Sequence, residues 1–225
     1  MPPIRPNLVA LLHRCHPQVY RIALALCADR DDAERVVEQV ITRSGPISGR
    51  WETEAEALRW FLHYTVLRSR DCPPCLPAAA EKDSLLNAAT SAESAAIIAA
   101  IRQLPMQQRE AFLLHHGEQL EFRQLATAMD CSSAAAANHL VCAVGTLKQL
   151  NSGELDDFTN QLPAMMKQLV PADEILEFQI QRMLARQRKW IWTRRVLRAM
   201  GWMILAVVVV WVAWTVGRMI HSQMG

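Results

Sequence analysis

The sequence predicts an all-α protein with two small helical domains, a juxtamembrane helix and one transmembrane helix. Apolar residues recur at helical spacing through most of residues 7–150, and no stretch alternates in the way typical of a half-buried strand. Residues 199–217 form a run without an ionisable side chain. Stretches rich in Pro, Gly and Ser divide the helical pattern into shorter pieces.

The first domain, residues 1–71, is expected to hold three helices. Residues 7–28 carry leucines and other aliphatic residues at helical spacing, with a bend near Pro17. An acidic turn, DRDD, supplies an N-cap and favourable charge for a second helix over Asp31–Arg43, which SGPISG is expected to end. The third helix runs from about Thr53 to Arg70.

A Pro- and Ala-rich stretch, residues 72–92, is typical of a linker between two small domains. It opens with DCPPC, in which Cys72 and Cys75 have the spacing of a metal knuckle or a redox pair. Because no second pair follows at zinc-finger spacing, incidental thiols in a linker are the favoured interpretation and no metal site is predicted.

The second domain, residues 93–152, carries a helix that ends at Pro105 and a second helix with the sequence MQQREAFLLHH. Leu120–Met129 and Ser132–Leu150 then form a helix-turn-helix pair. The turn places Asp130 where a left-handed conformation is needed, which Asp tolerates better than most residues.

Residues 153–198 are expected to form a juxtamembrane segment with a short helix and then a longer one. The longer helix has an apolar stripe that either packs on the domain, forms a stalk or receives a partner helix. Its members are Leu176, Ile180, Met183 and Leu184.

Residues 199–217 predict a single membrane span, since a helix of this length reaches about 28 Å across a hydrocarbon core of roughly 30 Å. Seven basic residues precede the span, and the tail 218–225 holds only one Lys or Arg. Basic flanks stay on the cytoplasmic side. We therefore expect a single-pass protein of the cytoplasmic (inner) membrane, with lipid contacts at 199–217 and the N-terminal domains in the cytoplasm.

The net charge of +2 conceals a strong asymmetry. Residues 1–181 contain 16 basic and 22 acidic residues, a net charge of −6, so the basic excess belongs to the membrane approach. Proteins that hold DNA by its phosphates usually present a basic face. The sequence also contains no nucleophile–base set, phosphate-binding glycine loop or metal-ligand spacing, so neither an enzyme nor a cofactor is predicted.

Two stretches together resemble the extracytoplasmic-function (ECF) type of RNA polymerase sigma factor. Residues 31–43 (DDAERVVEQVITR) and 57–71 (ALRWFLHYTVLRSRD) are similar to sigma region 2. Residues 101–150 are similar to region 4, with the opening LPMQQREAFLL and the helix-turn-helix. The resemblance implies two helical domains, binding to RNA polymerase core and contact with promoter DNA.

The resemblance also implies site residues. The acidic helix of region 2 docks on polymerase, and Trp60 and Asp71 fall in the segment that melts the −10 element. The predicted polymerase-binding residues are Asp32, Ala33, Glu34, Val37, Glu38 and Gln39. The predicted DNA-binding residues are Arg59, Trp60 and Tyr64 for the melted strand and Ser133, Asn138 and His139 for region 4.

The DNA-facing positions depart from the family pattern. Ala137 stands where the family has Lys, His139 and Cys142 replace two arginines, and no Lys or Arg occurs from Ser133 to Leu147. Weakened DNA contacts are therefore expected.

Three functional hypotheses follow. The first is a membrane-tethered sigma-like initiation factor that directs RNA polymerase core to promoters. The second is a sigma-like membrane regulator or adaptor that binds polymerase or a regulatory protein without reading DNA. The third is an unrelated helical, membrane-anchored interaction protein.

Overall fold

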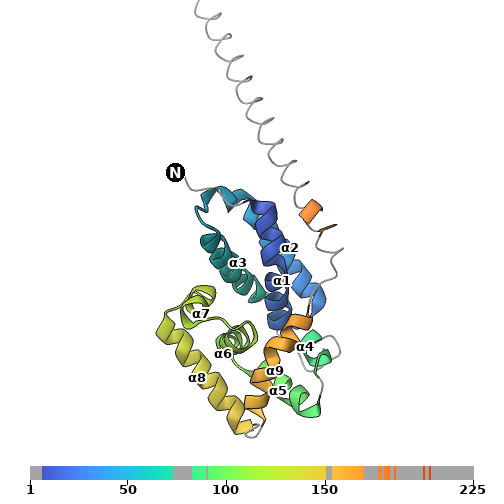
Figure 1. Ribbon diagram of the computed structural model, residues 1–225, viewed down its shortest axis with the longest axis vertical. Coiled ribbons are helices and arrows are strands. Elements are labelled where there is room, and N and C mark those ends of the chain that lie inside the picture. The colour runs from blue at the N-terminus through green and yellow to red at the C-terminus, as the bar shows by residue number, and fades with distance from the viewer. Residues whose placement is uncertain are drawn as a thin grey trace, which may run out of the picture. The chain divides into compact units, whose positions relative to one another are not determined.

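The computed structural model describes residues 7–72, 83–89, 91–150 and 154–169, and in addition 177, 178, 180–182, 185, 200 and 203. The chain divides into a unit of residues 1–180 and a second unit of residues 181–225. Every regular element of the described residues is a helix, which confirms the all-α prediction for this part of the chain (Figure 1).

In the first half of the unit 1–180, three helices form a bundle in which each packs on the other two. They are α1 (Leu8–Cys27), α2 (Arg30–Ile47) and α3 (Glu54–Ser69). Each begins at a side-chain cap: Asn7, Asp29 and Thr53 accept hydrogen bonds from backbone N–H groups of the first turn. The bundle core is almost entirely apolar. Its most buried large side chains are Leu12, Ile22 and Phe61.

Helix α2 runs four residues past Arg43, so the prediction that SGPISG breaks it at that point was wrong. Pro46 lies within the last turn, and a 3-10 turn, η1 (Ser48–Arg50), follows directly. The buried Ser44 hydroxyl donates to the Ile41 carbonyl at 2.7 Å, so this polar side chain is satisfied by its own helix.

The second half contains α5 (Ala92–Gln103), α6 (Met106–Phe112), α7 (Phe122–Met129) and α8 (Ser133–Leu150). Helix α6 continues into a π-type turn, η3 (Leu113–Gly117), before the chain reverses toward α7. Helices α7 and α8 form the predicted helix-turn-helix, and Asp130 between them has φ 57° and ψ 50°, the left-handed conformation expected from sequence.

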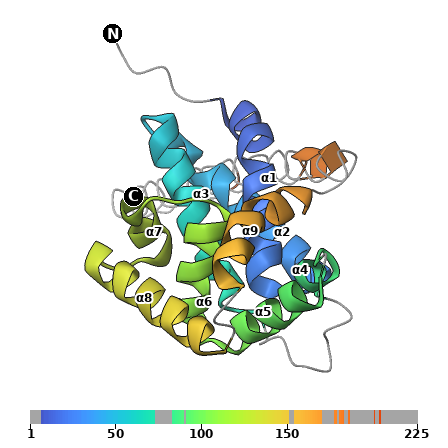
Figure 2. The same cartoon turned by 60° about the horizontal axis from the view of Figure 1, so that its bottom comes forward.

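Two further helices flank this half. The short α4 (Ser84–Asn87) lies inside the predicted linker, capped by Asp83. Helix α9 (Leu155–Gln168) packs on η3 and also contacts α1 and α5, as Figure 2 shows. A methyl group at Gly117 would lie 2.0 Å from Met166 Sδ, so the Met166 side chain of α9 would have to shift to admit any larger residue.

No helix among the described residues is long and apolar enough to span a bilayer. The predicted span, residues 199–217, lies outside the described residues except for Met200 and Met203. Of the predicted juxtamembrane stripe, only Ile180 is described, and it is buried; Leu176, Met183 and Leu184 lie outside the described residues.

Candidate nucleic-acid interface

An aromatic stack runs along one side of α3. Trp60 and Tyr64 are one helical turn apart, and their rings stack with centroids 4.8 Å apart and planes tilted by 15°. One turn further on, the guanidinium carbon of Arg68 lies 4.9 Å from the centroid of the Tyr64 ring. Trp51 and Phe61 support Trp60 from the core side, with centroids 5.4 Å and 5.3 Å from it.

The stack is half-exposed, whereas Trp51 and Phe61 beneath it are buried. The stack therefore presents flat ring surfaces and a cation to the solvent, while Trp51 and Phe61 hold it in place from the core side. The predicted residues Trp60 and Tyr64 are thus brought together by the structure. Arg59 is exposed next to Trp60, and its Nε donates to the Ala55 carbonyl of its own helix at 3.2 Å.

The predicted polymerase-binding residues of α2 fall on two different sides. Ala33 and Val37 have no exposed surface and pack inside the bundle, so in this structure they are core residues rather than surface residues. Helical geometry accounts for this, because positions four apart share a face, and this one is the apolar face. Their predicted role in polymerase binding stays a prediction. The polar members Asp32, Glu34, Glu38 and Gln39 remain at least partly exposed.

Local ion pairs already occupy part of this acidic surface. Glu34 accepts from Arg30 Nε at 3.0 Å, and Asp32 pairs with Arg35 one turn away. The Arg30–Glu34 pair is largely solvent-exposed, so it contributes little to stability and is readily exchanged for a partner's cation. In the second pair Arg35 is exposed, whereas the Asp32 side chain is mostly buried.

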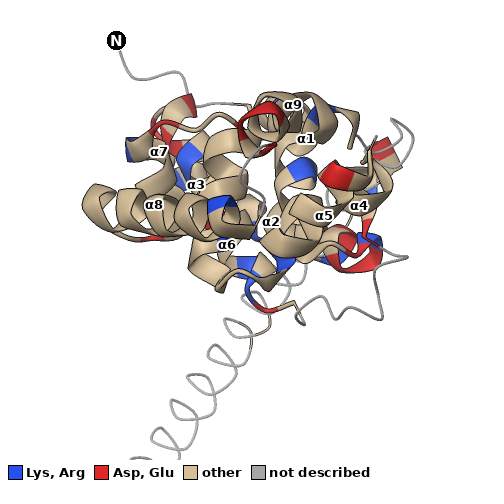
Figure 3. Cartoon of the chain, turned by 90° about the horizontal axis from the view of Figure 1, so that it is seen from below, with Lys and Arg blue, Asp and Glu red and all other residues tan. Residues whose placement is uncertain are grey.

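The outer face of α8 is small and apolar. Ser133 and Asn138 are exposed and His139 is half-buried, and the helix also exposes Ala134, Val141 and Cys142. In Figure 3 the α8 ribbon is tan along almost its whole length, because Ser133–Leu147 contains no charged residue. Lys148, just beyond, lies 3.7 Å from the carboxylate of Asp156.

Ion pairs join the two halves of the unit. Arg70 follows α3 and binds both carboxylate oxygens of Glu110 in α6, at 2.8 Å each. Arg21 in α1 binds both oxygens of Glu118, after η3, at 2.8 Å and 3.1 Å. Glu110 and Glu118 are almost completely buried, and bidentate pairing compensates much of the cost of burying their charge.

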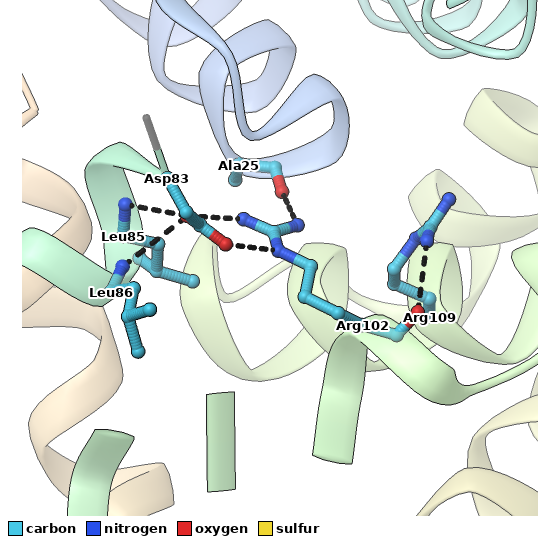
Figure 4. A network of polar contacts seen from close by, with 6 residues as sticks. All are labelled: Ala25, Asp83, Leu85, Leu86, Arg102 and Arg109. Atoms are coloured by element: carbon cyan, nitrogen blue, oxygen red, sulfur yellow. Dashed lines mark hydrogen bonds and ion pairs between the residues drawn. The ribbon is translucent and has the colours of Figure 1, made fainter. Parts of the chain in front are cut away.

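In a third ion pair, one partner is a residue of the predicted linker. Arg102 in α5 binds both oxygens of Asp83 at 2.7 Å and 2.9 Å and also donates to the Ala25 carbonyl in α1 (Figure 4). The same carboxylate accepts from the N–H groups of Leu85 and Leu86 and so caps α4. One buried network therefore ties the end of α1, the linker and α5 together.

Sequence reasoning did not identify these three pairs. Their partners lie 19 to 97 positions apart, and each residue type is ordinary on a helix surface. No local pattern distinguishes them from solvent-exposed charges.

Comparison with known proteins identifies the helix-turn-helix half. Residues 94–147 match the family model described as Sigma-70, region 4, which covers most of α5 and continues into α8. No curated protein sequence matches the chain. Among solved structures, the chain is similar to the sigma factor RpoE from Bartonella quintana, determined in a co-crystal with the anti-sigma factor NepR. The identity is 16%, the TM-score is 0.49, and the match covers 65% of this chain and 95% of that one.

Residues 94–147, which include α7 and most of α8, are therefore similar to sigma region 4. This match confirms the resemblance to region 4 that the sequence predicted for residues 101–150.

Proposed function

We propose that this protein is a membrane-tethered, sigma-like initiation factor that binds RNA polymerase core and directs it to promoters. The observation that supports this function most directly is the stack of Trp60, Tyr64 and Arg68 on α3, in a chain whose residues 94–147 match sigma region 4. A single-strand site needs planar side chains at the surface and a nearby cation, and the stack supplies both.

The proposed chemistry at α3 is base stacking. A base released from the duplex stacks on an aromatic ring with a gain of about 1–3 kcal/mol, largely independent of its identity. Arg68 adds a cation above the Tyr64 ring, and the exposed Arg59 can turn toward a phosphate by giving up its bond to Ala55. The support from Trp51 limits the entropy lost when the base binds.

Polymerase binding is assigned to the exposed acidic side of α2, from Asp31 to Gln39. Its carboxylates suit a basic partner surface, where electrostatic attraction accelerates association. Residues 199–217 are assigned as the tether, with the N-terminal domains in the cytoplasm, on the basis of the apolar run and the basic residues that precede it.

The outer face of α8 favours a second candidate function. A recognition helix without cations gives up the phosphate contacts that supply most non-specific affinity. A sigma-like regulator that binds polymerase, or a regulatory protein, without reading DNA would need none of them.

One experiment separates the two candidates. The full-length chain in mild detergent is mixed with bacterial core polymerase, and both core binding and run-off transcripts from a genomic promoter pool are measured. We expect binding with defined transcripts, and loss of the transcripts but not of binding in Trp60→Ala. The matched control is Phe178→Ala, which truncates another exposed aromatic residue, 65% exposed and far from α3 in sequence.

Binding without transcripts would assign the protein to the regulator function. Absence of core binding would reject the initiation factor and the polymerase-binding form of the regulator, and would leave only a regulator that binds another regulatory protein. Transcripts that survive in Trp60→Ala would reject the aromatic stack as the strand-binding element.

A further inference from the structure

Two cysteines from different helices meet at one end of the first bundle. Cys27 is the last residue of α1, Cys72 follows the end of α3, and their Sγ atoms lie 3.1 Å apart. A disulfide requires about 2.05 Å, so the sulfurs need to approach by only about 1 Å. In the structure both are free thiols.

The backbone holds each thiol in place. Cys27 is buried, and the chain leaves α1 through a tight turn in which the Asp29 N–H donates to the Cys27 carbonyl at 2.8 Å. The Cys72 N–H donates to the Ser69 carbonyl at 3.2 Å. Cys72 is only half-buried, so a small oxidant can reach its sulfur.

We propose that Cys27 and Cys72 form a reversible disulfide when the protein meets a peroxide such as hydrogen peroxide. This inference stands independently of the proposed transcription function, because it rests on the geometry of the thiol pair alone. Disulfides in reducing compartments are typically transient and redox-sensing.

The reaction proceeds in two balanced steps. The Cys72 thiolate attacks one peroxide oxygen, so that an S–O bond forms, the O–O bond breaks and hydroxide leaves; the sulfur is oxidised and the peroxide reduced. The sulfur of Cys27 then attacks the Cys72 sulfur, the S–S bond forms and the S–O bond breaks. The departing hydroxide takes up the Cys27 proton and leaves as water. Thiol–disulfide exchange with a small thiol restores the pair.

The order of attack follows from burial. Burial raises the pKa of the Cys27 thiol, and the hydrogen bond with Cys72 raises it further. Cys27 is therefore a poor first nucleophile, whereas Cys72 is the more accessible sulfur.

The disulfide would form where the two halves of the unit meet. On the Cys27 side, the Ala25 carbonyl accepts from Arg102 and the Ala28 carbonyl accepts from the Ser84 N–H. On the other side, Arg70 is two residues before Cys72 and binds Glu110 in α6. A bond between the sulfurs would fix the ends of α1 and α3, and with them the surface on which α4, α5 and α6 are held.

Peptide mapping of the wild-type, full-length chain tests the proposal. The protein is treated with hydrogen peroxide in the presence of EDTA, alkylated, and digested with trypsin without reductant. Cleavage at the flanking basic residues releases peptides 22–30, with Cys27, and 71–82, with Cys72 and Cys75. We expect the two peptides joined, two hydrogen atoms lighter than their sum, with Cys75 alkylated, and separated again by dithiothreitol.

Two results would overturn the proposal. An internal disulfide within peptide 71–82, with Cys27 alkylated, would assign oxidation to the linker pair. Complete alkylation of both peptides after peroxide treatment would show that the thiols do not couple. Because the wild-type chain is used, neither result depends on how a variant folds.

The melting temperature of cysteine variants provides a second test of the disulfide. Oxidation should raise the Tm of the wild-type chain by about 10 °C, since the bond closes a loop that contains all of α2. Cys75→Ser should keep this shift, and Cys72→Ser should lose it. A shift that persists in Cys72→Ser would also overturn the assignment.

Discussion

Arg70 and Glu110 form a bidentate ion pair between the two halves of the unit, with both N–O distances at 2.8 Å. Arg70 Nη2 also donates to the Met129 carbonyl at the end of α7, at 3.0 Å. The hydrogen bond with Glu110 raises the pKa of the Arg70 guanidinium, so this side chain stays charged. One side chain thus connects the end of the aromatic helix α3 to both α6 and the helix-turn-helix.

Glu110→Gln should lower the free energy of unfolding by about 3 kcal/mol, because it leaves a partly buried guanidinium without its counter-charge. Urea denaturation followed by circular dichroism measures this. Asp71→Asn is the matched control, since it breaks the exposed pair with Arg68 and should cost less than about 1 kcal/mol. Equal losses in the two variants would show that the Arg70 pair is not a structural link.

Gly117→Ala should destabilise the chain by about 1–3 kcal/mol, because the added methyl group meets the buried Met166 of α9. Thermal unfolding gives the loss, and adding Met166→Ala should recover part of it, so that the double variant loses less than the sum of the single changes. Gly145→Ala on the exposed side of α8 is the control. No atom lies within 4 Å of its new methyl group, so it should gain up to about 1 kcal/mol from helix propensity.

Ala28→Gly should stabilise the protein by about 1 kcal/mol. Ala28 has φ 67° and ψ −47° at the centre of the tight turn between α1 and α2, a conformation that is strained for any residue with a Cβ. Ala23→Gly, the same change inside α1, should instead lose about 1 kcal/mol or more. Chemical denaturation measures the free energy of unfolding of both variants. A change in the same direction in the two variants would contradict this explanation of the turn.

Local chemistry made much of the fold predictable from sequence. Asp29 signals the start of α2 because its side chain can accept from the first N–H groups, and Asp130 marks the turn of the helix-turn-helix because Asp tolerates the left-handed region. Trp60 and Tyr64, which the sequence predicted to act together, do stack on one face of α3, because residues four apart share one face of a helix. Their predicted contact with DNA stays a prediction.

What sequence could not predict depends on contacts between distant segments. The pairing of Arg21 with Glu118, and of Cys27 with Cys72, is decided by how the helices pack, and neither partner has a local pattern that identifies the other. The burial of Ala33 and Val37 was missed because the family's docking helix was carried over as a whole, without separating its core face from its surface face.

His116 should make stability depend on pH. Burial lowers its pKa to about 4, with a smaller contribution from His115, and its Nε2 has no partner among the described residues. The unfolded chain binds this proton near pH 6.5. Stability is therefore fully present above about pH 6.5, falls as pH is lowered toward 4, and levels off below.

In His116→Gln, the loss of stability between about pH 7 and about pH 5 should be smaller than in the wild-type chain. Urea denaturation at the two pH values measures the difference. An unchanged loss would assign the pH dependence to other groups.

Restoring cations on α8 should strengthen DNA binding if this helix faces DNA. Val141 is 68% exposed, and Ala137 occupies the position where the sigma pattern has Lys. The double variant Ala137→Lys, Val141→Arg adds two charges that can meet phosphates, so the slope of log affinity against log salt should steepen by about 2. Fluorescence anisotropy with a duplex, over a series of salt concentrations, measures the slope for the full-length chain in detergent.

The control Gln161→Lys, Gln168→Arg adds the same charges at exposed positions of α9 and should leave the slope nearly unchanged. A slope that steepens equally in both variants would show that only net charge matters. A slope that changes in neither would mean that α8 does not face DNA, and would favour the regulator that binds polymerase without reading a promoter.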